Sequence, residues 1–239
     1  MNLNFQIVVP FYNDYENFLK FVEIISNHDI PNDTFLIVDN GSDNNDIIEF
    51  DKKIEQKEKC WKIEKSEKNL GFGGGIKFGA QHTDKDYIAW MPGNLKLNPI
   101  DVFELCKKFK TNEINILLKA NRTGRPTSDT LKTRIFGIVV SLFFGLNLND
   151  AGGTPNMTHS KFFKRIKEIP DDFKFDVFVL YYFRKNNLKV IRPKINYTKR
   201  LHGSSHWQTG ILPEIKLLLD VLNSRKKWNK ICQINIDDN

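Results

Sequence analysis

Arginine is missing from the first half of this 239-residue chain, whose eight arginines all lie at or after Arg122. Residues 1–119 carry 15 Lys and 19 Asp or Glu, which gives them a net charge of −4. Residues 120–210 carry 16 Lys or Arg and 6 Asp or Glu, a net charge of +10, and residues 211–239 add +1. A basic middle joined to a slightly acidic first half indicates an anionic partner, for which phosphates, a membrane surface and nucleic acid are the candidates.

Cysteine is also scarce, and long apolar runs are absent. The three cysteines (Cys60, Cys106, Cys232) are far apart and follow no metal-ligand spacing, which argues against a disulfide scaffold or a zinc site and favours a reducing cytosol. The longest apolar run, Ile135–Leu146, has 12 residues, whereas a helix needs about 20 to span a bilayer. No signal-peptide pattern is evident. We therefore expect a cytoplasmic protein, soluble or peripheral on the inner face of the cytoplasmic membrane.

The composition suits an ordinary folded domain, since 40% of the residues are hydrophobic and 27% are charged. Over the first 120 residues, strand patterns alternate with helix patterns. Apolar runs of strand length lie at residues 5–9, 34–38, 61–64, 87–91 and 114–120, and helical patterns at 14–27, from 69 onward and at 100–110. Strands that are apolar on both faces and separated by helices predict a doubly wound parallel sheet, with ligands at the carboxyl ends of its strands.

The second half of the chain has longer polar segments. The pattern predicts a basic loop at 121–133, an apolar helix at 134–148, a helix at 173–186, a strand at 188–193, a loop at 197–207 and an amphipathic helix at 213–230. Two interpretations stay open for the apolar stretch Ile135–Leu146 and for the helix at 213–230. Each is either an ordinary core helix or a surface that dips into lipid.

Three motifs suggest a ligand site, and each also has an ordinary structural explanation. Asp39 directly follows an apolar strand, where a carboxylate can accept from a base N–H or a ribose hydroxyl, or can cap the turn "DNGSD". The stretch "GFGGGIKFG" lets backbone approach an anion at a helix N-terminus, or lets a helix pack tightly on a strand, and it is neither a P-loop nor G-x-G-x-x-G. Four arginines lie in or beside loops, where guanidinium groups suit phosphates or are simply solvated: Arg122, Arg125, Arg134 and Arg200.

Taken in order, four segments resemble glycosyltransferases of family 2 with the GT-A fold. These are "VVPFYND" (8–14), "VDNGSDN" (38–44), "NLGFGGGIKFG" (69–79) and "WMPGNLKLNP" (90–99). Three later segments, at 120–153, 173–193 and 197–205, resemble the branch that transfers sugars to polyprenyl or dolichyl phosphate. The resemblance covers about residues 5–207.

The resemblance implies an α/β fold of GT-A (Rossmann-like) type, a mostly parallel sheet with flanking helices and a C-terminal amphipathic helix. It implies a glycosyltransferase domain at 1–207, with a nucleotide-binding half at 1–120 and an acceptor and phosphate half at 121–207. Residues 208–239 would form the C-terminal amphipathic helix and tail.

Roles follow from the same resemblance, position by position. The nucleotide would be held by Pro10, Phe11, Tyr12, Asn13, Asp14, Asp39, Asn69, Gly71 and Lys77. The donor diphosphate and an acceptor phosphate would be held by Arg122, Arg134 and Arg200, with Ser204 or Ser205. Asp150 and Asp176 match acidic positions of the branch.

One departure from the family pattern changes the expected chemistry. The D-x-D-x-Q segment that holds a divalent metal in this branch reads Pro92-Gly93-Asn94-Leu95-Lys96 here. An ammonium group cannot ligate Mg²⁺, so a Mg²⁺ or Mn²⁺ cofactor is doubtful. Our hypothesis is that Lys96, beside Asn94 and with Arg122 and Arg200, replaces the metal as the electrostatic stabiliser of the departing nucleoside diphosphate.

These residues predict a glycosyltransferase that moves a sugar from a nucleotide-sugar donor to a polyprenyl-phosphate lipid at a membrane surface. One alternative is transfer to a saccharide hydroxyl in surface-polysaccharide assembly, with Asp176 as the general base. Another is a non-catalytic relative that only binds nucleotide sugars. A nucleic-acid binder is disfavoured, because no recognised module and no aromatic interleaving accompany the basic loops.

Overall fold

The computed structural model describes residues 4–53, 59–197 and 211–234. Within them a central sheet has the strand order β3-β2-β1-β4-β7-β5-β8, and β7 alone runs against its neighbours. The strands are β1 (Phe5–Phe11), β2 (Phe35–Asp39), β3 (Trp61–Lys65), β4 (Tyr87–Trp90), β5 (Ile116–Lys119), β7 (Asn156–His159) and β8 (Lys189–Ile191). A small parallel pair, β6 (Asn121–Thr123) with β9 (Lys194–Asn196), lies beyond the end of β5.

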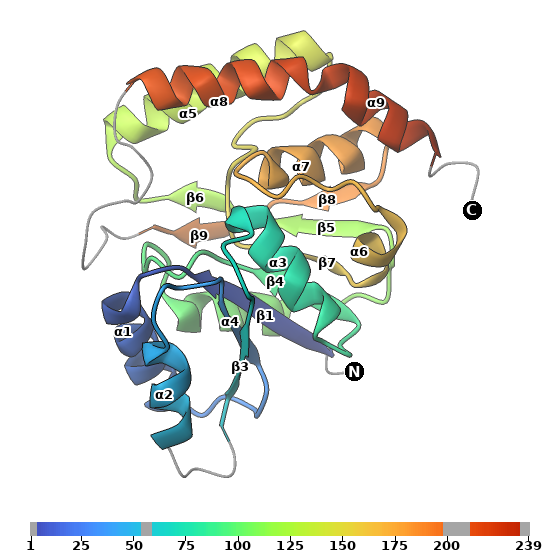
Figure 1. Ribbon diagram of the computed structural model, residues 1–239. Helices are drawn as coiled ribbons and strands as arrows, with labels where there is room; N and C mark the ends of the chain where they lie inside the picture. The colour runs from blue at the N-terminus through green and yellow to red at the C-terminus, as the bar shows by residue number, and fades with distance from the viewer. Residues whose placement is uncertain (1–3, 54–58, 198–210, 235–239) are drawn as a thin grey trace.

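Helices cover both faces of the sheet (Figure 1). They are α1 (Tyr15–Ser26), α2 (Asp46–Lys53), α3 (Gly71–Gln81), α4 (Pro99–Lys108), α5 (Thr127–Phe144), α6 (Lys161–Arg165), α7 (Phe175–Lys185), α8 (Ile211–Asn223) and α9 (Arg225–Ile234). The helices α1, α2 and α4 pack on one face, and α3, α6 and α7 pack on the other. A further layer, formed by α5, α8 and α9, closes over α7.

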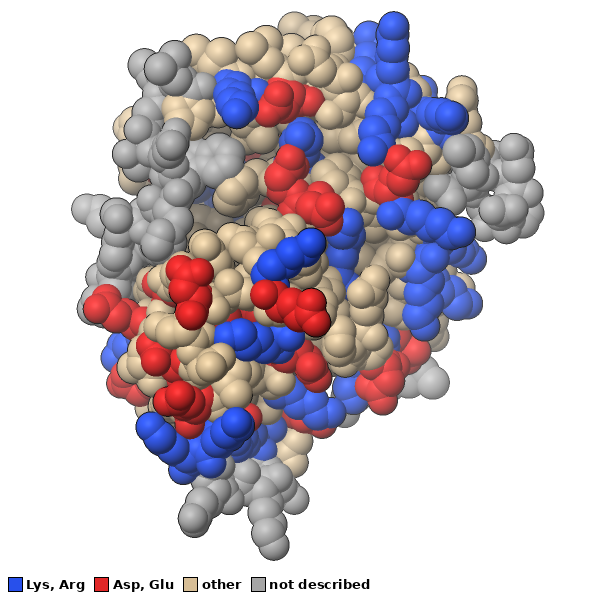
Figure 2. All heavy atoms as spheres, in the orientation of Figure 1, with Lys and Arg blue, Asp and Glu red and all other residues tan. Residues whose placement is uncertain are grey.

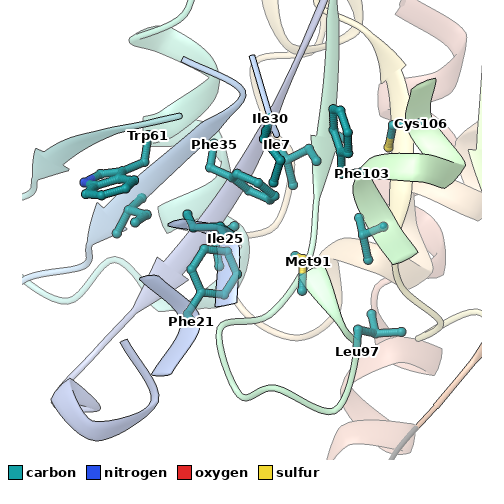
Figure 3. Packing of buried hydrophobic residues seen from close by; sticks show 14 of the residues in the cluster. Ile7, Phe21, Ile25, Ile30, Phe35, Trp61, Met91, Leu97, Phe103 and Cys106 are labelled. Atoms are coloured by element: carbon teal, nitrogen blue, oxygen red, sulfur yellow. The ribbon is translucent and has the colours of Figure 1, made fainter. Parts of the chain in front are cut away.

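The core under α1 and α4 is rich in aromatic rings (Figure 3). Phe21 of α1 meets Phe35 of β2 edge to face, with ring centroids 5.3 Å apart. Every residue of β2 is buried, as expected for a central strand of a parallel sheet that is covered on both faces. This continuous burial is what the apolar runs of the first half predict.

The second core holds the C-terminal helices against the body of the protein. Trp228 of α9 is buried and packs on Phe178 and Tyr181 of α7, with ring centroids 5.4 and 5.5 Å apart. The same indole stacks on Phe144, the last residue of α5. One aromatic side chain therefore joins three helices.

The structure confirms the predicted α/β fold with its mostly parallel sheet, and it corrects several elements. The C-terminal amphipathic helix is two helices, because the chain turns at Ser224 between α8 and α9. The apolar helix begins at Thr127, so the predicted basic loop contains β6 and the first two turns of α5. The sequence analysis also missed β7. None of the described helices is long and apolar enough to cross a membrane.

Helix α3 lies on the sheet through glycine. A Cβ atom added at Gly79 would stand 2.5 Å from Cγ1 of the buried Val8 on β1. Gly79 therefore supports the interpretation that this stretch lets a helix pack tightly on a strand.

We predict that Gly79→Ala lowers the free energy of unfolding by about 1–3 kcal/mol through overpacking. By helix propensity alone, alanine in place of glycine would stabilise the protein by about 1 kcal/mol. The sign of the change in unfolding free energy therefore shows whether packing or helix propensity dominates. Urea unfolding measures the change, with Gly152→Ala as the control because a Cβ there meets no atom within 4 Å. A stabilised Gly79→Ala protein would contradict the prediction.

Candidate active site at the carboxyl edge of the sheet

The carboxyl ends of four strands meet at one edge of the sheet. β1 lies between β2 and β4 and is parallel to both. β7 is antiparallel to both β4 and β5, so β5 runs in the same direction as the first three. The loops that leave these strands carry most of the described residues for which the sequence analysis predicts a function.

Asp39, the last residue of β2, has no exposed surface. Its Oδ1 accepts a hydrogen bond of 3.0 Å from the backbone N–H of Ser42, so the turn-capping interpretation is confirmed. Its Oδ2 lies 3.3 Å from Nζ of Lys65 but has no hydrogen-bond partner among the described residues. The Lys65 charge compensates this oxygen, which still lacks a hydrogen-bond donor in the described part of the chain and so keeps the capacity to accept one from a ligand.

The loops after β1 and β2 bind each other. Asn13, in a left-handed conformation with φ of 47°, donates from its amide side chain to Asp43 at 2.8 Å. The backbone N–H of Asp43 donates back to Oδ1 of Asn13 at 3.0 Å. A pocket of about 240 Å³ lies here, lined by Asn13, Asp14, Tyr15, Ser42, Asp43 and Asn44.

The start of α3 is fixed by amide side chains. Oδ1 of Asn69 accepts from the N–H of Gly71 at 2.8 Å, and the side chain of Asn40 donates to the Gly71 carbonyl at 3.0 Å. Asn40 also lies at this edge, and the sequence analysis did not single it out although it directly follows Asp39. Lys77 lies further along the helix, where it donates to the carbonyl of Ile169 and pairs with Asp171.

The segment after β4 forms a tight turn over β1. Gly93 packs on the ring of Phe11, where an added Cβ would stand 2.5 Å from the ring. Oδ1 of Asn94 accepts from the backbone N–H of Lys96 at 3.2 Å, and Leu95 between them has a positive φ of 54°. The side chains of Asn94 and Lys96 are half-buried.

The donor atoms of this turn do not fit a divalent cation. The turn offers an amide and an ammonium group where carboxylate oxygens are needed. In the described ranges, no group of three or more His, Cys, Asp or Glu side chains is placed to hold a metal ion.

A buried charge network lies under the other half of the edge. Lys119, at the end of β5, is fully buried and donates to the carbonyl of Gly153 at 2.8 Å and to Oδ1 of Asn156 at 3.1 Å. Asn156 and the Trp90 indole both donate to Oδ1 of Asp176, each at 2.9 Å. The network therefore joins β4, β5, β7 and α7.

Burial works against both charges of this network. Burial lowers the pKa of Lys119 to about 8, although the nearby Asp176 opposes the change. Burial also raises the pKa of Asp176, and the Lys119 charge opposes that change. Sequence reasoning missed Lys119, and the available signal was a single cation inside the apolar run "ILLKA".

Arg122 lies just beyond this network, on β6. Its Nε donates to both carboxylate oxygens of Asp150, at 3.0 and 3.2 Å, and its guanidinium lies over the Tyr197 ring. Burial disfavours the charge, but Asp150 raises the pKa of Arg122 overall. Arg192 adds a third cation, donating to Oδ1 of Asn121 at 2.7 Å.

Comparisons with known proteins decide the family. A sequence model described as "Glycosyl transferase family 2" matches residues 6–192. The chain belongs to glycosyl transferase family 2. Its members transfer sugars, so the protein is a glycosyltransferase of the EC 2.4 class that uses a nucleotide-sugar donor. No curated protein matches the sequence.

Solved structures confirm the fold. Glucosyl-3-phosphoglycerate synthase from Mycobacterium tuberculosis, in complex with Mn²⁺, UDP and glucosyl-3-phosphoglycerate, matches with a TM-score of 0.66. Its sequence is 14% identical, and the match covers 93% of this chain and 80% of that one. The same synthase with Mn²⁺, UDP-glucose and glycerol 3-phosphate gives the same values. A second match, titled only as a mycobacterial protein, has a TM-score of 0.64 at 12% identity and covers 93% of this chain and 74% of that one. At these identities the likeness shows the fold alone.

The predicted residues of this family 2 glycosyltransferase fall into three groups. Pro10, Tyr12, Asn13, Asp14, Asp39, Asn69, Gly71, Asn94, Lys96, Arg122, Asp150 and Asp176 lie at or directly under the carboxyl edge. The Phe11 ring is buried against Phe18 and Phe21, Lys77 pairs with Asp171, and Arg134 lies two turns into α5 instead of opening the helix. Arg200, Ser204 and Ser205 lie outside the described residues. The ligand roles themselves stay predictions.

We predict that Lys119 and Asp176 are energetically coupled. Lys119→Met leaves the acceptors at Gly153 and Asn156 without their donor, which should cost about 1–3 kcal/mol of unfolding free energy. Asp176→Asn should also destabilise, but the double variant should cost less than the two single costs together, by about 0.5 kcal/mol or more. Urea unfolding of the four proteins measures the coupling, and Lys107→Met, at an exposed position, is the control. Strict additivity would contradict the coupling.

The same pair predicts a dependence on pH. The unfolded Lys119 holds its proton up to about pH 10.5, whereas the folded one releases it near pH 8. The unfolded state binds more protons over that range, so the Lys119 contribution to stability rises with pH. The difference in unfolding free energy between wild type and Lys119→Met should therefore grow between pH 8 and 10.

Proposed function

We propose that the protein transfers a sugar from a nucleotide-sugar donor to a phosphate-bearing acceptor, of which a polyprenyl phosphate is the class we favour. The observation that carries this proposal is the cation-rich cluster at the carboxyl end of β5. Among the described residues, Lys119, Arg122 and Arg192 interact there with two carboxylates, those of Asp150 and Asp176. A net positive site beside the nucleotide loops suits a second phosphate group.

The reaction needs no general base if the acceptor is a phosphate. An acceptor phosphate oxygen forms the new bond to the anomeric carbon. The bond from that carbon to the donor diphosphate breaks, and its electron pair leaves with the nucleoside diphosphate. The acceptor is already ionised at neutral pH, so no proton has to be removed from it. The burial of Asp176 and its bonds to Trp90 and Asn156 support a structural role for this carboxylate.

The leaving diphosphate carries the charge that must be stabilised. We assign this task to Lys96, with the cations around Arg122. The turn from Asn94 to Lys96 is closed by its own hydrogen bond and lies on the Phe11 ring, so it presents Lys96 from a fixed backbone. Fixed positive charges close to the developing anion lower the activation barrier, because no groups have to reorient during the reaction. In related enzymes a metal ion stabilises this charge.

The nucleoside is assigned to the rim formed by the loops after β1 and β2. Oδ2 of Asp39, which pairs with Lys65 but accepts no hydrogen bond among the described residues, is the acceptor we assign to a base N–H or ribose hydroxyl. The pocket lined by Asn13 and Asp43 belongs to the same two loops, and Ser42, which donates to Asp39, also lines it.

We predict that Asp39→Asn weakens binding of nucleoside diphosphates by about tenfold to a hundredfold. The new amide would place a donor where a ligand donor is expected, which costs about 1–3 kcal/mol. Isothermal titration calorimetry against a panel of nucleoside diphosphates measures the effect. Asp101→Asn, on the exposed side of α4, is the matched control. Unchanged affinity for every nucleotide would remove Asp39 from the site.

We predict that wild-type activity persists in excess EDTA, whereas Lys96→Ala lowers kcat by about 10²–10³. Lys96→Arg, which keeps the charge, should retain part of it, and Lys107→Ala should match wild type. The assay is a screen of nucleotide-sugar donors against a short polyprenyl phosphate, scored for glycolipid product. Complete loss of wild-type activity in EDTA, restored by Mg²⁺ or Mn²⁺, would overturn the role of Lys96.

The same screen separates the competing functions. Product on saccharide hydroxyls and none on phosphates would favour the polysaccharide alternative, and Asp176→Asn should then abolish turnover while nucleotide binding is kept. Nucleotide binding without transfer from any donor would favour a non-catalytic relative.

A further inference from the structure

The long helix α5 exposes an apolar stripe to solvent. Leu131, Ile135, Ile138 and Leu142 are at least half exposed, and Leu142 reaches 78%. Their spacing of three and four residues places them on one side of the helix. The opposite side carries the buried residues Gly137, Val140 and Phe144, so the stripe points away from the core.

Helix α8 extends this apolar surface. It packs beside α5, and Lys132 of α5 pairs with Glu214 of α8 at 2.9 Å. Ile215 and Leu219 of α8 are about half exposed. We call the six aliphatic residues the docking face: Leu131, Ile135, Ile138, Leu142, Ile215 and Leu219. Exposed large aliphatic side chains gathered on two adjacent helices usually mark a surface that meets another apolar phase.

Cations border the docking face. Lys132 and Arg134 are exposed on α5 itself. Helix α9 adds four more exposed cations, Arg225, Lys226, Lys227 and Lys230, and Lys227 pairs with Glu168. Figure 2 shows Lys and Arg side chains gathered at the upper right, where Figure 1 places α9.

The apolar and basic surfaces adjoin at one contact. The guanidinium of Arg225 lies 5.1 Å from the ring centre of Phe143 on α5, and that ring is itself partly exposed. Trp228 fixes α9 against α5 and α7, so the cations stand on a packed helix. The apolar and the basic residues of this surface therefore lie on helices that pack against the core.

We propose that the docking face and the cations of α9 bind the surface of an anionic lipid bilayer. Helices with an apolar side and flanking Lys or Arg lie in the plane of such an interface, with the aliphatic groups among the acyl chains. Negatively charged lipid head groups complement the cations. A second copy of the chain fits less well, because a twofold pairing of this face would set the cations of both copies against each other.

Docking in this way brings the proposed acceptor site to the membrane. Helix α5 begins four residues after Thr123, at the end of β6, which also carries Arg122. The use of the surface for acceptor delivery rests on the proposed function, whereas lipid binding itself does not. The test is therefore made without donor or acceptor.

The experiment is flotation of the full chain with vesicles of phosphatidylcholine alone or mixed with phosphatidylglycerol. Binding is expected only to the anionic vesicles and should weaken at high salt. Leu131→Ser with Leu142→Ser, and separately Lys226→Glu with Lys230→Glu, should each lower the partition coefficient by about tenfold or more. These positions are exposed, so thermal unfolding should be unchanged. Leu19→Ser with Lys20→Glu, on α1, is the matched control.

Three results would overturn the proposal. The first is no binding to anionic vesicles. The second is binding that neither pair of substitutions weakens. The third is a dimer in sedimentation that dissociates when Leu131 and Leu142 are substituted. Transfer to a water-soluble, short-chain acceptor tests the proposed function separately. An active enzyme that does not bind vesicles would overturn the docking proposal alone. A protein that binds vesicles but transfers no sugar would overturn the proposed function alone.

Discussion

The buried ammonium group of Lys119 is the interaction on which the second half of the site depends. It lies at the end of β5, where it donates hydrogen bonds to the Gly153 carbonyl and to Oδ1 of Asn156, two buried acceptors. Asn156 then orients Asp176, which also receives the Trp90 indole from the strand that leads into the Lys96 turn. A buried polar network of this kind is stable only when each member has its partners, so it fixes the relative positions of four elements.

The two halves of the edge use different chemistry, in agreement with the uneven charge of the chain. The loops after β1 and β2 present amides, hydroxyls and a carboxylate, groups that can pair with neutral N–H and O–H groups. The end of β5 and the small β6–β9 pair present guanidinium and ammonium groups, which suit phosphates. All the arginines at this edge therefore lie on its second half, as the position of the first arginine at Arg122 requires.

The fold was largely predictable, because strands covered on both faces must be apolar throughout and their order along the chain leaves few topologies. β7 was missed because Asn156 and Thr158 look solvent-facing, yet both are buried and bonded to other elements. Lys119 was missed for the same reason, since its partners lie about 35 residues away in the chain. The Asp39 turn was predictable because its cap is local. The break at Ser224 was missed because α9 is held by Trp228, whose partners on α5 and α7 are distant in the chain and leave no local pattern.

The reciprocal hydrogen bonds between Asn13 and Asp43 make one rim out of two loops that are separate in the chain. In the proposed nucleoside site this rim is set by folding, so less ordering would remain to oppose the binding of a nucleotide. A change at Asn13 removes both bonds, whereas a change at Asp43 removes only the side-chain bond, because the other uses the Asp43 backbone N–H. The loops after β1 and β2 are therefore one structural unit, and a transplant of one loop without the other would lose the shape of the rim.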